Sequence, residues 1–478
     1  MKVYHLPLDS RPCNWLFPGQ LAGWCGHECL TPETMDWFTQ PATFESCRDF
    51  LLDAAKEADA LVVSADHLCY GSLLESRNDT ISQPEALERL EFLSDIHRAN
   101  PALPIHAYGV VMRSSVSALY AGDLEVHRAM TEYSMYTDRA AVTGSAEDAE
   151  RAEAARARLS PRVLRRYEAA RARNHAVNRR CVELAGEGVL SSLLLLQEDS
   201  EPWGFHKAEQ RALKKLQAEK NVRKMWLHNG TDEGGALAVM KAIGEAGGLQ
   251  PVAVKFLGCE NGDFIARYED RPFGENVWSM LEYASLRAEE DAQDVLAVCC
   301  PPDGIQTDWP NPLHEEGLEQ MAQEISALVQ NGRNVYVLDV TRANGGAPAL
   351  MDKVRRLVDP CELAGYSAWN TASNSLGTAV AQMMSDRLAG RIQQTFFWER
   401  LLDDLAYQGV VRGLLNDELE AAGEDLLHLH EPQKAEARMR ELMQELVTHD
   451  PLYAKAPAFS IRLPWGRTFE AEVVLTKK

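Results

Sequence analysis

Residues 227–240 read LHNGTDEGGALAVM and contain one complete change of pattern from strand to helix. An apolar run that begins at Met225 stops at two adjacent carboxylates, Asp232 and Glu233, and a glycine pair then opens a helix-like stretch. The same order of apolar run, polar loop and helical stretch recurs along the chain. Repeated units of this kind predict an α/β fold with a parallel sheet.

Nine apolar runs are candidates for strands. Most are continuous rather than alternating, which is typical of parallel strands covered by helices on both faces. We expect a parallel (β/α) barrel-like body. Nine runs are one more than a closed barrel of eight strands uses, so two doubly wound α/β halves that meet near residue 245 remain the alternative. The run 295–299 ends in cysteine and proline and would be peripheral in a barrel. The runs are 3–8, 60–64, 105–112, 190–196, 224–227, 251–257, 295–299, 335–340 and 364–368.

The chain is expected to have two parts. Residues 1–390 form the α/β catalytic body, and an inserted helical hairpin at about 144–186 is dense in Ala, Arg and Glu. Residues 391–478 form a C-terminal appendage of acidic helices and two short strands, with a turn at 464–466. The charged hairpin is expected to be largely exposed.

Charge and composition narrow the classes of partner. The 478 residues carry a net charge of −22, which disfavours nucleic acid and anionic membrane surfaces. No apolar stretch reaches the length of a membrane span, the first residues (MKVYHLPLDS) lack the apolar segment of a signal peptide, and the ten cysteines are scattered. We therefore expect a cytoplasmic protein that acts on a small-molecule or oligosaccharide substrate, and a homo-oligomer remains open.

Polar side chains follow almost every predicted strand. In parallel α/β folds the ligand binds beyond the carboxyl ends of the strands, so these side chains are candidates for a site. A carboxylate that only caps the next helix can be single, whereas here carboxylates, arginines and amides occur together. The candidates are Asp9, Arg11, Asp66, Arg113, Glu198, Asp199, Asp232, Glu233, Asp339, Asn344, Trp369 and Asn370.

Two adjacent carboxylates at a strand end can do different work, because successive side chains point in different directions. Glycosidases need two carboxyl groups that flank the scissile bond, and crowding raises the pKa of one of them. We therefore expect a glycoside hydrolase in which Glu233 is the general acid/base. Asp232 and Asp199 would orient the sugar or stabilise charge, and the other candidates would bind substrate.

Motifs spread over nearly the whole chain resemble those of a bacterial family known only as a domain of unknown function. They are LPLDSRPCN at 6–14, QEDSEPWG at 197–204, GTDE at 230–233, ANGG at 343–346, SAWNTASNSLG at 367–377 and PWGRTFE at 464–470. The chain departs from the family pattern at Glu198, where Asp is usual, and at Ser367, where Gly is usual. The family name implies no activity.

A shorter resemblance does imply one. GTDE at 230–233 is similar to the Gly-Asp-Glu motif of β-N-acetylhexosaminidases, which are barrels. There the Asp positions the acetamido group of the substrate and the Glu is the acid/base. By this resemblance Asp232 would orient the substrate and Glu233 would protonate the leaving oxygen.

Two other classes of function remain open. A divalent-metal-dependent hydrolase or lyase would use oxygen and imidazole ligands from Asp9, Asp66, His67, Asp199, Asp232 and Asp339. A protein that binds a sugar or an organic acid would need no chemistry. No GxGxxG or GxxxxGK[ST] motif occurs, so no nucleotide cofactor is expected, and a divalent metal is the one cofactor left open.

Overall fold

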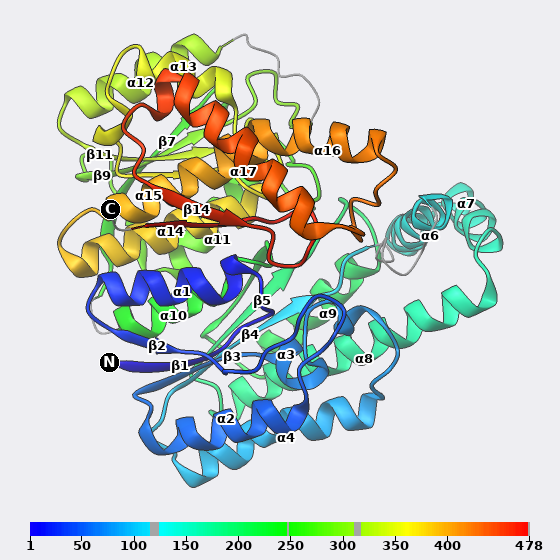
Figure 1. Ribbon diagram of the computed structural model, residues 1–478. Coiled ribbons are helices and arrows are strands. Elements are labelled where there is room, and N and C mark those ends of the chain that lie inside the picture. The colour runs from blue at the N-terminus through cyan, green and yellow to red at the C-terminus, as the bar shows by residue number, and fades with distance from the viewer. Residues whose placement is uncertain (115–123, 246–247, 310–316, 477–478) are drawn as a thin grey trace. The chain divides into compact units, whose positions relative to one another are not determined.

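The computed structural model describes residues 1–114, 124–245, 248–309 and 317–476. The chain divides into two compact units (Figure 1). The first consists of Met1–Gly23, His27–Ile243 and Tyr268–Asp270, and the second of Trp24–Gly26, Gly244–Arg267 and Arg271–Lys478. The boundary expected at residue 390 stays a prediction and lies within the second unit.

A six-stranded parallel sheet forms the centre of the first unit, in the order β2-β1-β3-β4-β5-β6. Five of these strands correspond to predicted apolar runs, and the three-residue β2 does not. The strands are β1 (Lys2–Leu6), β2 (Glu28–Leu30), β3 (Ala60–Ser64), β4 (Ile105–Val111), β5 (Ser192–Gln197) and β6 (Met225–Asn229).

Helices cover both faces of this sheet, which is why its strands are apolar on both sides. Alternate side chains such as Leu61, Val63 and Leu195 pack under the helices of one face. These helices are α2 (Phe44–Glu57), α4 (Gln83–Ala99), α8 (Pro161–Gly186) and α9 (Phe205–Glu219). Figure 1 shows α1 (Pro12–Trp24) and α10 (Gly234–Gly244) on the opposite face.

The glycine pair at the start of α10 lets this helix lie directly on the sheet. A Cβ atom on Gly234 would overlap the side chain of Leu196 in β5. A Cβ atom on Gly235 would come within 2.8 Å of Cε1 of His5 in β1. Helix α10 therefore runs from the edge strand β6 back across the face toward β1, and the residues just before it are carried in the same direction.

The expected insertion consists of α7 (Ala146–Ala157) and α8, whose first turn begins at Pro161 with Ser160 as its cap. Helix α7 packs against α6 (Leu124–Thr143), and Figure 1 shows this pair projecting from the first unit. Helix α8 is partly buried instead. Its Asn174 and Asn178 donate hydrogen bonds to the backbone oxygens of Ser76 and Val110.

The second unit contains a five-stranded parallel sheet in the order β13-β11-β9-β7-β8. Four of its strands were predicted, and the three-residue edge strand β8 was not. The run 295–299 lies in β9 at the centre of this sheet, so the expectation that it is peripheral is wrong. The strands are β7 (Gln250–Leu257), β8 (Leu286–Ala288), β9 (Asp294–Cys299), β11 (Asn334–Asp339) and β13 (Gly365–Ser367).

Helices also cover both faces of the second sheet. On one face α12 (Leu318–Gln330), α13 (Pro348–Arg355), the π-helix η5 (Leu401–Val411) and α17 (Pro432–His449) share a core with β9 and β11. Helix α14 (Ala372–Ala389) contacts β11 and β13 and packs on α11 (Phe273–Tyr283). The remaining elements include α15 (Gln394–Arg400), α16 (Arg412–Ala421), the short parallel pair β10 (Thr307–Asp308) and β12 (Arg342–Ala343), and the antiparallel pair β14 (Phe459–Arg462) and β15 (Glu472–Leu475).

The fold is thus mixed α/β with parallel sheets, as the apolar runs predicted. The barrel is not confirmed, because the strands in the described part of the chain form open sheets. Each of the two large sheets ends in a short strand that pairs on one side only, and closure would require those edge strands to pair. None of the helices in the described ranges is both long and apolar enough to cross a membrane.

Candidate functional site

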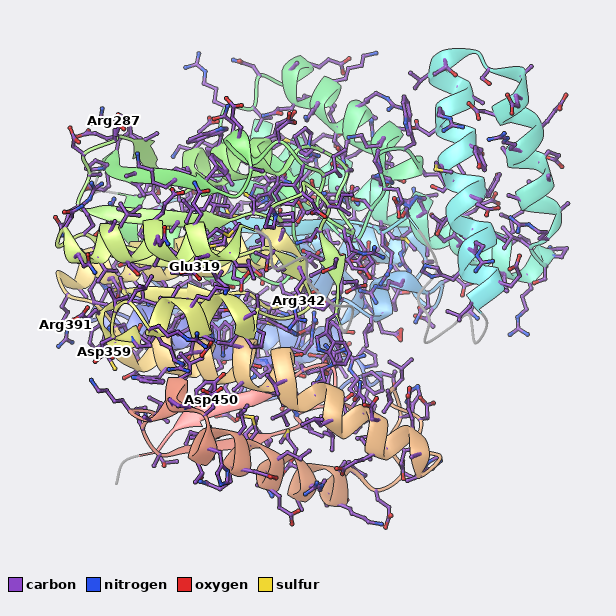
Figure 2. The ribbon with its side chains drawn as sticks, turned by 90° about the horizontal axis from the view of Figure 1, so that it is seen from above. Arg287, Glu319, Arg342, Asp359, Arg391 and Asp450 are labelled. Atoms are coloured by element: carbon purple, nitrogen blue, oxygen red, sulfur yellow. The ribbon has the colours of Figure 1, made fainter. Side chains whose placement is uncertain are left out.

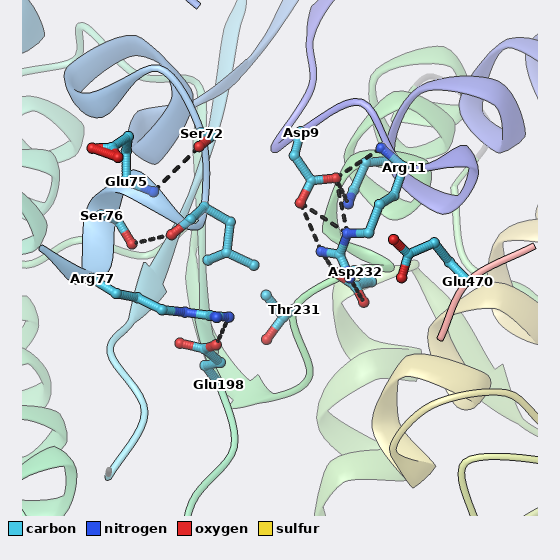
Figure 3. A network of polar contacts seen from close by, with 12 residues as sticks. Asp9, Arg11, Ser72, Glu75, Ser76, Arg77, Glu198, Thr231, Asp232 and Glu470 are labelled. Carbon is cyan, nitrogen blue, oxygen red and sulfur yellow. Dashed lines mark hydrogen bonds and ion pairs between the residues drawn. The ribbon is translucent and has the colours of Figure 1, made fainter. Parts of the chain in front are cut away.

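The guanidinium group of Arg11 joins two carboxylates that follow distant strands of the first sheet, β1 and the edge strand β6 (Figure 3). Its Nε donates to both oxygens of Asp9 at 3.1 and 3.0 Å, and Nη2 donates to Asp9 Oδ2 at 2.7 Å. Nη1 and Nη2 donate to the two oxygens of Asp232 at 2.9 and 2.5 Å. Asp9 follows β1 and Asp232 follows β6. Because Asp232 lies just before α10, which packs across the sheet toward β1, its carboxylate comes within reach of Arg11.

The charged groups of this cluster are buried, so they interact strongly with one another. Asp9 is 0 % exposed and Arg11 is 6 % exposed, and Asn14 Nδ2 donates to Asp9 Oδ1 at 2.7 Å. Burial lowers the pKa of Arg11, but Asp232 and Asp9 raise it more, so it stands well above its ordinary value. Burial raises the pKa of Asp232 despite the opposing effect of Arg11, and the hydrogen bonds of Arg11 to both of its oxygens fix the position of this carboxyl group.

The carboxyl group of Glu233 has different surroundings from that of its neighbour Asp232. Its Oε2 accepts a hydrogen bond of 2.8 Å from the backbone N–H of Thr231, and within the described residues its buried Oε1 has no partner. Burial raises the pKa of Glu233 well above its ordinary value, and the charges of Asp232 and Glu269 add to that rise. The raised pKa favours the neutral, protonated form of Glu233, and one of its two carboxyl oxygens has no partner among the described residues.

The position of this carboxyl group depends on Gly230. The residue has a φ of +119°, and a Cβ atom there would overlap the carboxyl group of Glu233. The Glu233 side chain therefore folds back over the loop that precedes it. This is the reason that a glycine begins the GTDE sequence.

A second ionic group forms where β4 and β5 end. Glu198 pairs with Arg77, and its Oε1 lies 3.7 Å from Nη1 of Arg113. Arg113 also pairs with Asp199 at 2.8 Å, and the Asp199 side chain is 33 % exposed. Figure 3 shows Thr231 between this group and the Arg11 group, and the charge of Arg11 lowers the pKa of Arg77, although burial is the larger cause.

Asp66 has a structural contact. It lies in α3 (Ala65–Tyr70), directly after β3, and its Oδ2 accepts a hydrogen bond of 2.8 Å from the backbone N–H of Val110. Burial raises the pKa of Asp66 to about 7. The residue thus ties α3 to β4 beneath the strand ends.

Asp339 and Asn344 belong to the second unit, where both help to fix loops. Asp339 Oδ1 accepts from the backbone N–H and the hydroxyl of Thr341, and Oδ2 accepts from Ala347 N and Tyr366 Oη at 2.7 and 3.1 Å. Asn344 has a φ of +63° and donates to Asp308 Oδ1 at 2.9 Å. The four hydrogen bonds that Asp339 accepts all come from the loop after β11 or from β13.

The loop after β11 is also held by its own arginine. Arg342, which Figure 2 labels, donates to the backbone oxygens of Gly346 and Gly409 at 2.6 and 3.2 Å. These bonds attach the loop to η5. Arg342 thus fixes the backbone of the second unit.

Trp369 and Asn370 follow β13 in the second unit. The Trp369 indole packs on Phe469 with ring centroids 5.7 Å apart, and in the described chain its buried Nε1 has no hydrogen-bond partner. Asn370 has a φ of +71°, a backbone conformation that asparagine tolerates better than most residues. An unpartnered indole N–H and an asparagine at one strand end are groups that can bind a hydroxyl-bearing ligand.

Several polar residues next to these side chains were not predicted. In the first unit they are Asn14 and Arg77. In the second they are Arg400, Asp403 and Asp404: Asp404 accepts from Ala368 N at 2.8 Å and from Arg400 Nη1 at 2.9 Å. Burial raises the pKa of Asp403 to about 7. None of these residues directly follows a strand of a large sheet, so the strand-end rule could not select them.

The predicted candidates therefore form groups within each unit. Asp9, Arg11 and Asp232 are joined directly, Glu233 is next to them, and Glu198, Asp199 and Arg113 form the neighbouring group. Across residues 1–114, 124–245, 248–309 and 317–476, no three His, Cys, Asp or Glu side chains gather as a metal site would require. The ligand set expected for a metal-dependent enzyme is thus not assembled there.

Comparison with known proteins gives one match. A family model described as "Protein of unknown function (DUF4127)" matches residues 3–474. No curated protein and no solved structure matches the chain.

Proposed function

We propose, for a chain that belongs to the DUF4127 family of proteins of unknown function, the activity of a glycoside hydrolase with Glu233 as the general acid/base. The observation that carries the proposal is the state of Glu233. Its carboxyl group is buried, its pKa is raised, and one of its oxygens has no partner in the described residues. A raised pKa favours the protonated form that a glycosidase needs in order to give a proton to the leaving oxygen.

The neighbouring carboxylates have the complementary property. Asp232 is fixed by Arg11, so it supplies a negative charge close to the reacting bond without needing to move. That charge stabilises an oxocarbenium-like transition state, in which positive charge develops on the sugar ring. Asp199 is the more exposed carboxylate of the two and orients polar groups of the substrate together with Arg113.

The other predicted contacts remain part of the proposal. Asp9 and Arg11 keep Asp232 in place, and Arg113 and Glu198 bind hydroxyl groups of the sugar. Asp66 stabilises the strand ends below them. The candidates of the second unit form a group of their own, in which the indole N–H of Trp369 has no partner among the described residues, Asp339 and Asn344 shape loops, and Asn370 follows the same strand as Trp369.

The test is hydrolysis of a panel of aryl glycosides by the full chain and by Glu233→Gln. Loss of a general acid costs about 10²–10⁴-fold in rate when the leaving group is poor. A dinitrophenolate leaves without a proton, so dinitrophenyl glycosides should lose much less than methyl or 4-methylumbelliferyl glycosides. This dependence on the leaving group separates a lost acid from a damaged fold.

The matched control is Glu209→Gln. Glu209 lies in α9, pairs with Arg171 at 3.1 Å, and burial raises its pKa to about 7, yet it is not part of the candidate site. This variant should retain normal rates. Equal losses for good and poor leaving groups in Glu233→Gln, or full activity in that variant, would exclude Glu233 as the acid.

The same panel separates the alternatives. Activity that disappears with a chelator and returns with a divalent ion would favour a metal-dependent hydrolase or lyase. Tight binding of a saccharide or an organic acid by calorimetry, without turnover of any glycoside, would favour a binding protein. Either result would replace the glycosidase proposal.

A further inference from the structure

Two cysteines meet beyond the carboxyl ends of adjacent strands in the second unit. Strands β7 and β9 pair with Leu257 opposite Cys299, and Cys300 N donates to Leu257 O at 2.8 Å. Cys259 follows β7 by two residues, and the interaction between the two thiols is the largest cause of the pKa shift of each. The two sulfur atoms are therefore neighbours because their strands are neighbours.

Gly258 sets this arrangement. It has a φ of +89°, and a Cβ atom on it would lie 2.7 Å from the backbone oxygen of Cys300. The chain thus passes directly against Cys300 before it reaches Cys259. A larger residue at position 258 would push the two strand ends apart.

The two thiols have unequal surroundings. Cys259 is partly exposed, whereas Cys300 is 0 % exposed. The hydrogen bond from Cys300 lowers the pKa of Cys259 to about 7, and hydrogen bonds from the backbone N–H groups of Gly262 and Asp263 contribute to that value. The same hydrogen bond and burial raise the pKa of Cys300. Near pH 7 Cys259 is therefore partly ionised while Cys300 stays protonated, an asymmetry that suits a thiol pair to oxidation.

The partly exposed thiol opens on a cavity. The cavity has a volume of about 470 Å³ and is lined by Cys259, Gly258, Glu260, Pro302, Gln320 and Glu324, among others. It lies at the start of α12, next to the short 3₁₀ turn η3 (Glu260–Gly262). A small neutral oxidant can therefore reach Cys259, while Cys300 is shielded behind it.

We propose that Cys259 and Cys300 form a reversible disulfide on reaction with hydrogen peroxide, with Cys259 as the attacking thiol and Cys300 as the resolving thiol. The Cys259 thiolate attacks one peroxide oxygen, the O–O bond breaks, and with one proton from solvent a sulfenic acid and water form. Cys300 then attacks the Cys259 sulfur, an S–S bond replaces the S–O bond, and hydroxide leaves as water with the thiol proton of Cys300. Two thiols give two electrons to one peroxide, and two waters form.

The first test is the alkylation rate of each cysteine in the full chain at pH 7, measured by mass spectrometry with iodoacetamide. Cys361 is the matched control, because it is also partly exposed but burial raises its pKa. At pH 7 the fraction of Cys259 that is ionised is about 50 times that of Cys361 or more. A thiolate of lower pKa is about 8 times less nucleophilic, so Cys259 should react roughly six times faster than Cys361 or more. An equal or slower rate at Cys259 would overturn the assignment of the attacking thiol.

The second test is treatment with hydrogen peroxide, followed by alkylation under denaturing conditions and peptide mapping. The expected product is one cross-linked peptide pair that contains Cys259 and Cys300 and that dithiothreitol separates. In Cys300→Ala, Cys259 should instead accumulate as a sulfenic acid that dimedone captures, while Cys361→Ala should still form the disulfide. Oxidation of Cys259 to sulfinic acid in the unsubstituted chain, with Cys300 still free, would refute the proposal without any variant.

Discussion

Replacing Arg11 with methionine would remove the guanidinium group that lies between Asp9 and Asp232. Asp9 would keep its hydrogen bonds from Asn14 and from the Arg11 backbone N–H, whereas Asp232 would lose both bonds from the guanidinium group. A buried carboxylate without its cation takes up a proton instead of staying charged. The cost of the substitution is then mainly the cost of protonating Asp232.

That cost depends on pH in a calculable way. An ordinary aspartate has a pKa near 3.9, so protonating it at pH 7 takes about 3 pKa units, or about 4 kcal/mol, and at pH 5 only about 1.5 kcal/mol. The native variant holds a proton that its unfolded state releases, so its free energy of unfolding rises as the pH falls. The destabilisation caused by Arg11→Met should therefore shrink by about 2.7 kcal/mol, that is about 2 × 1.36 kcal/mol, between pH 7 and pH 5.

The assay is urea unfolding of both proteins at pH 5 and pH 7, followed by tryptophan fluorescence. In the double variant Arg11→Met/Asp232→Asn the pH dependence of the difference should vanish, because an amide needs no proton. Arg438→Met, in an exposed arginine that pairs with Glu418, should change the stability little at either pH. A destabilisation by Arg11→Met that is the same at both pH values would refute the reasoning.

Two further predictions concern the buried sheet of the first unit. Burial raises the pKa of Asp66 to about 7, so the native state holds a proton that the unfolded state has lost, and stability should fall by about 3 kcal/mol as the pH rises from 4 to 7. Asp66→Asn should lack this fall in urea unfolding measured across that range, and an unchanged slope would contradict the burial argument. Gly235→Ala places a Cβ 2.8 Å from His5 Cε1 and should cost about 1–3 kcal/mol, whereas Gly19→Ala in α1 has open space and should add about 0.5–1 kcal/mol. Thermal unfolding measures both glycine variants, and a stabilised Gly235→Ala would show that α10 does not rest on the sheet.

The strands could be predicted because continuous apolar runs report burial on both faces. All nine predicted runs coincide with strands, from β1 to β13. The two edge strands β2 and β8 could not be found, since each has three residues and their outer residues are exposed or half-exposed. Such strands are defined by their hydrogen bonds to a neighbour rather than by an apolar pattern.

The order of the strands could not be predicted from the apolar runs. An apolar run indicates that a strand is buried on both faces, but it does not indicate which strand is its neighbour. A closed barrel and two open sheets differ in which strands are neighbours, and the nine apolar runs are compatible with both arrangements. Only the surplus run and the change near residue 245 favoured the open alternative.

The strand-end rule found part of the candidate site and missed part. It selected Asp9, Arg11 and Asp232, which are in contact. The contact itself requires α10 to cross the sheet, and that crossing depends on side-chain volumes at Gly234 and Gly235. Arg77 was missed because it lies in a 3₁₀ turn after α3, where local sequence gives no sign that its guanidinium reaches Glu198.

The assignment of Tyr268–Asp270 to the first unit has a consequence for dissecting the protein. These three residues lie between stretches of the second unit, yet the Tyr268 carbonyl accepts a bond of 2.8 Å from Ser200 N, and Asp270 accepts one of 2.5 Å from Gln210 Nε2. A protein fragment that ends at residue 243 would lack both of these hydrogen-bond acceptors. Residues 268–270 would therefore have to be joined to such a fragment to restore these two hydrogen bonds.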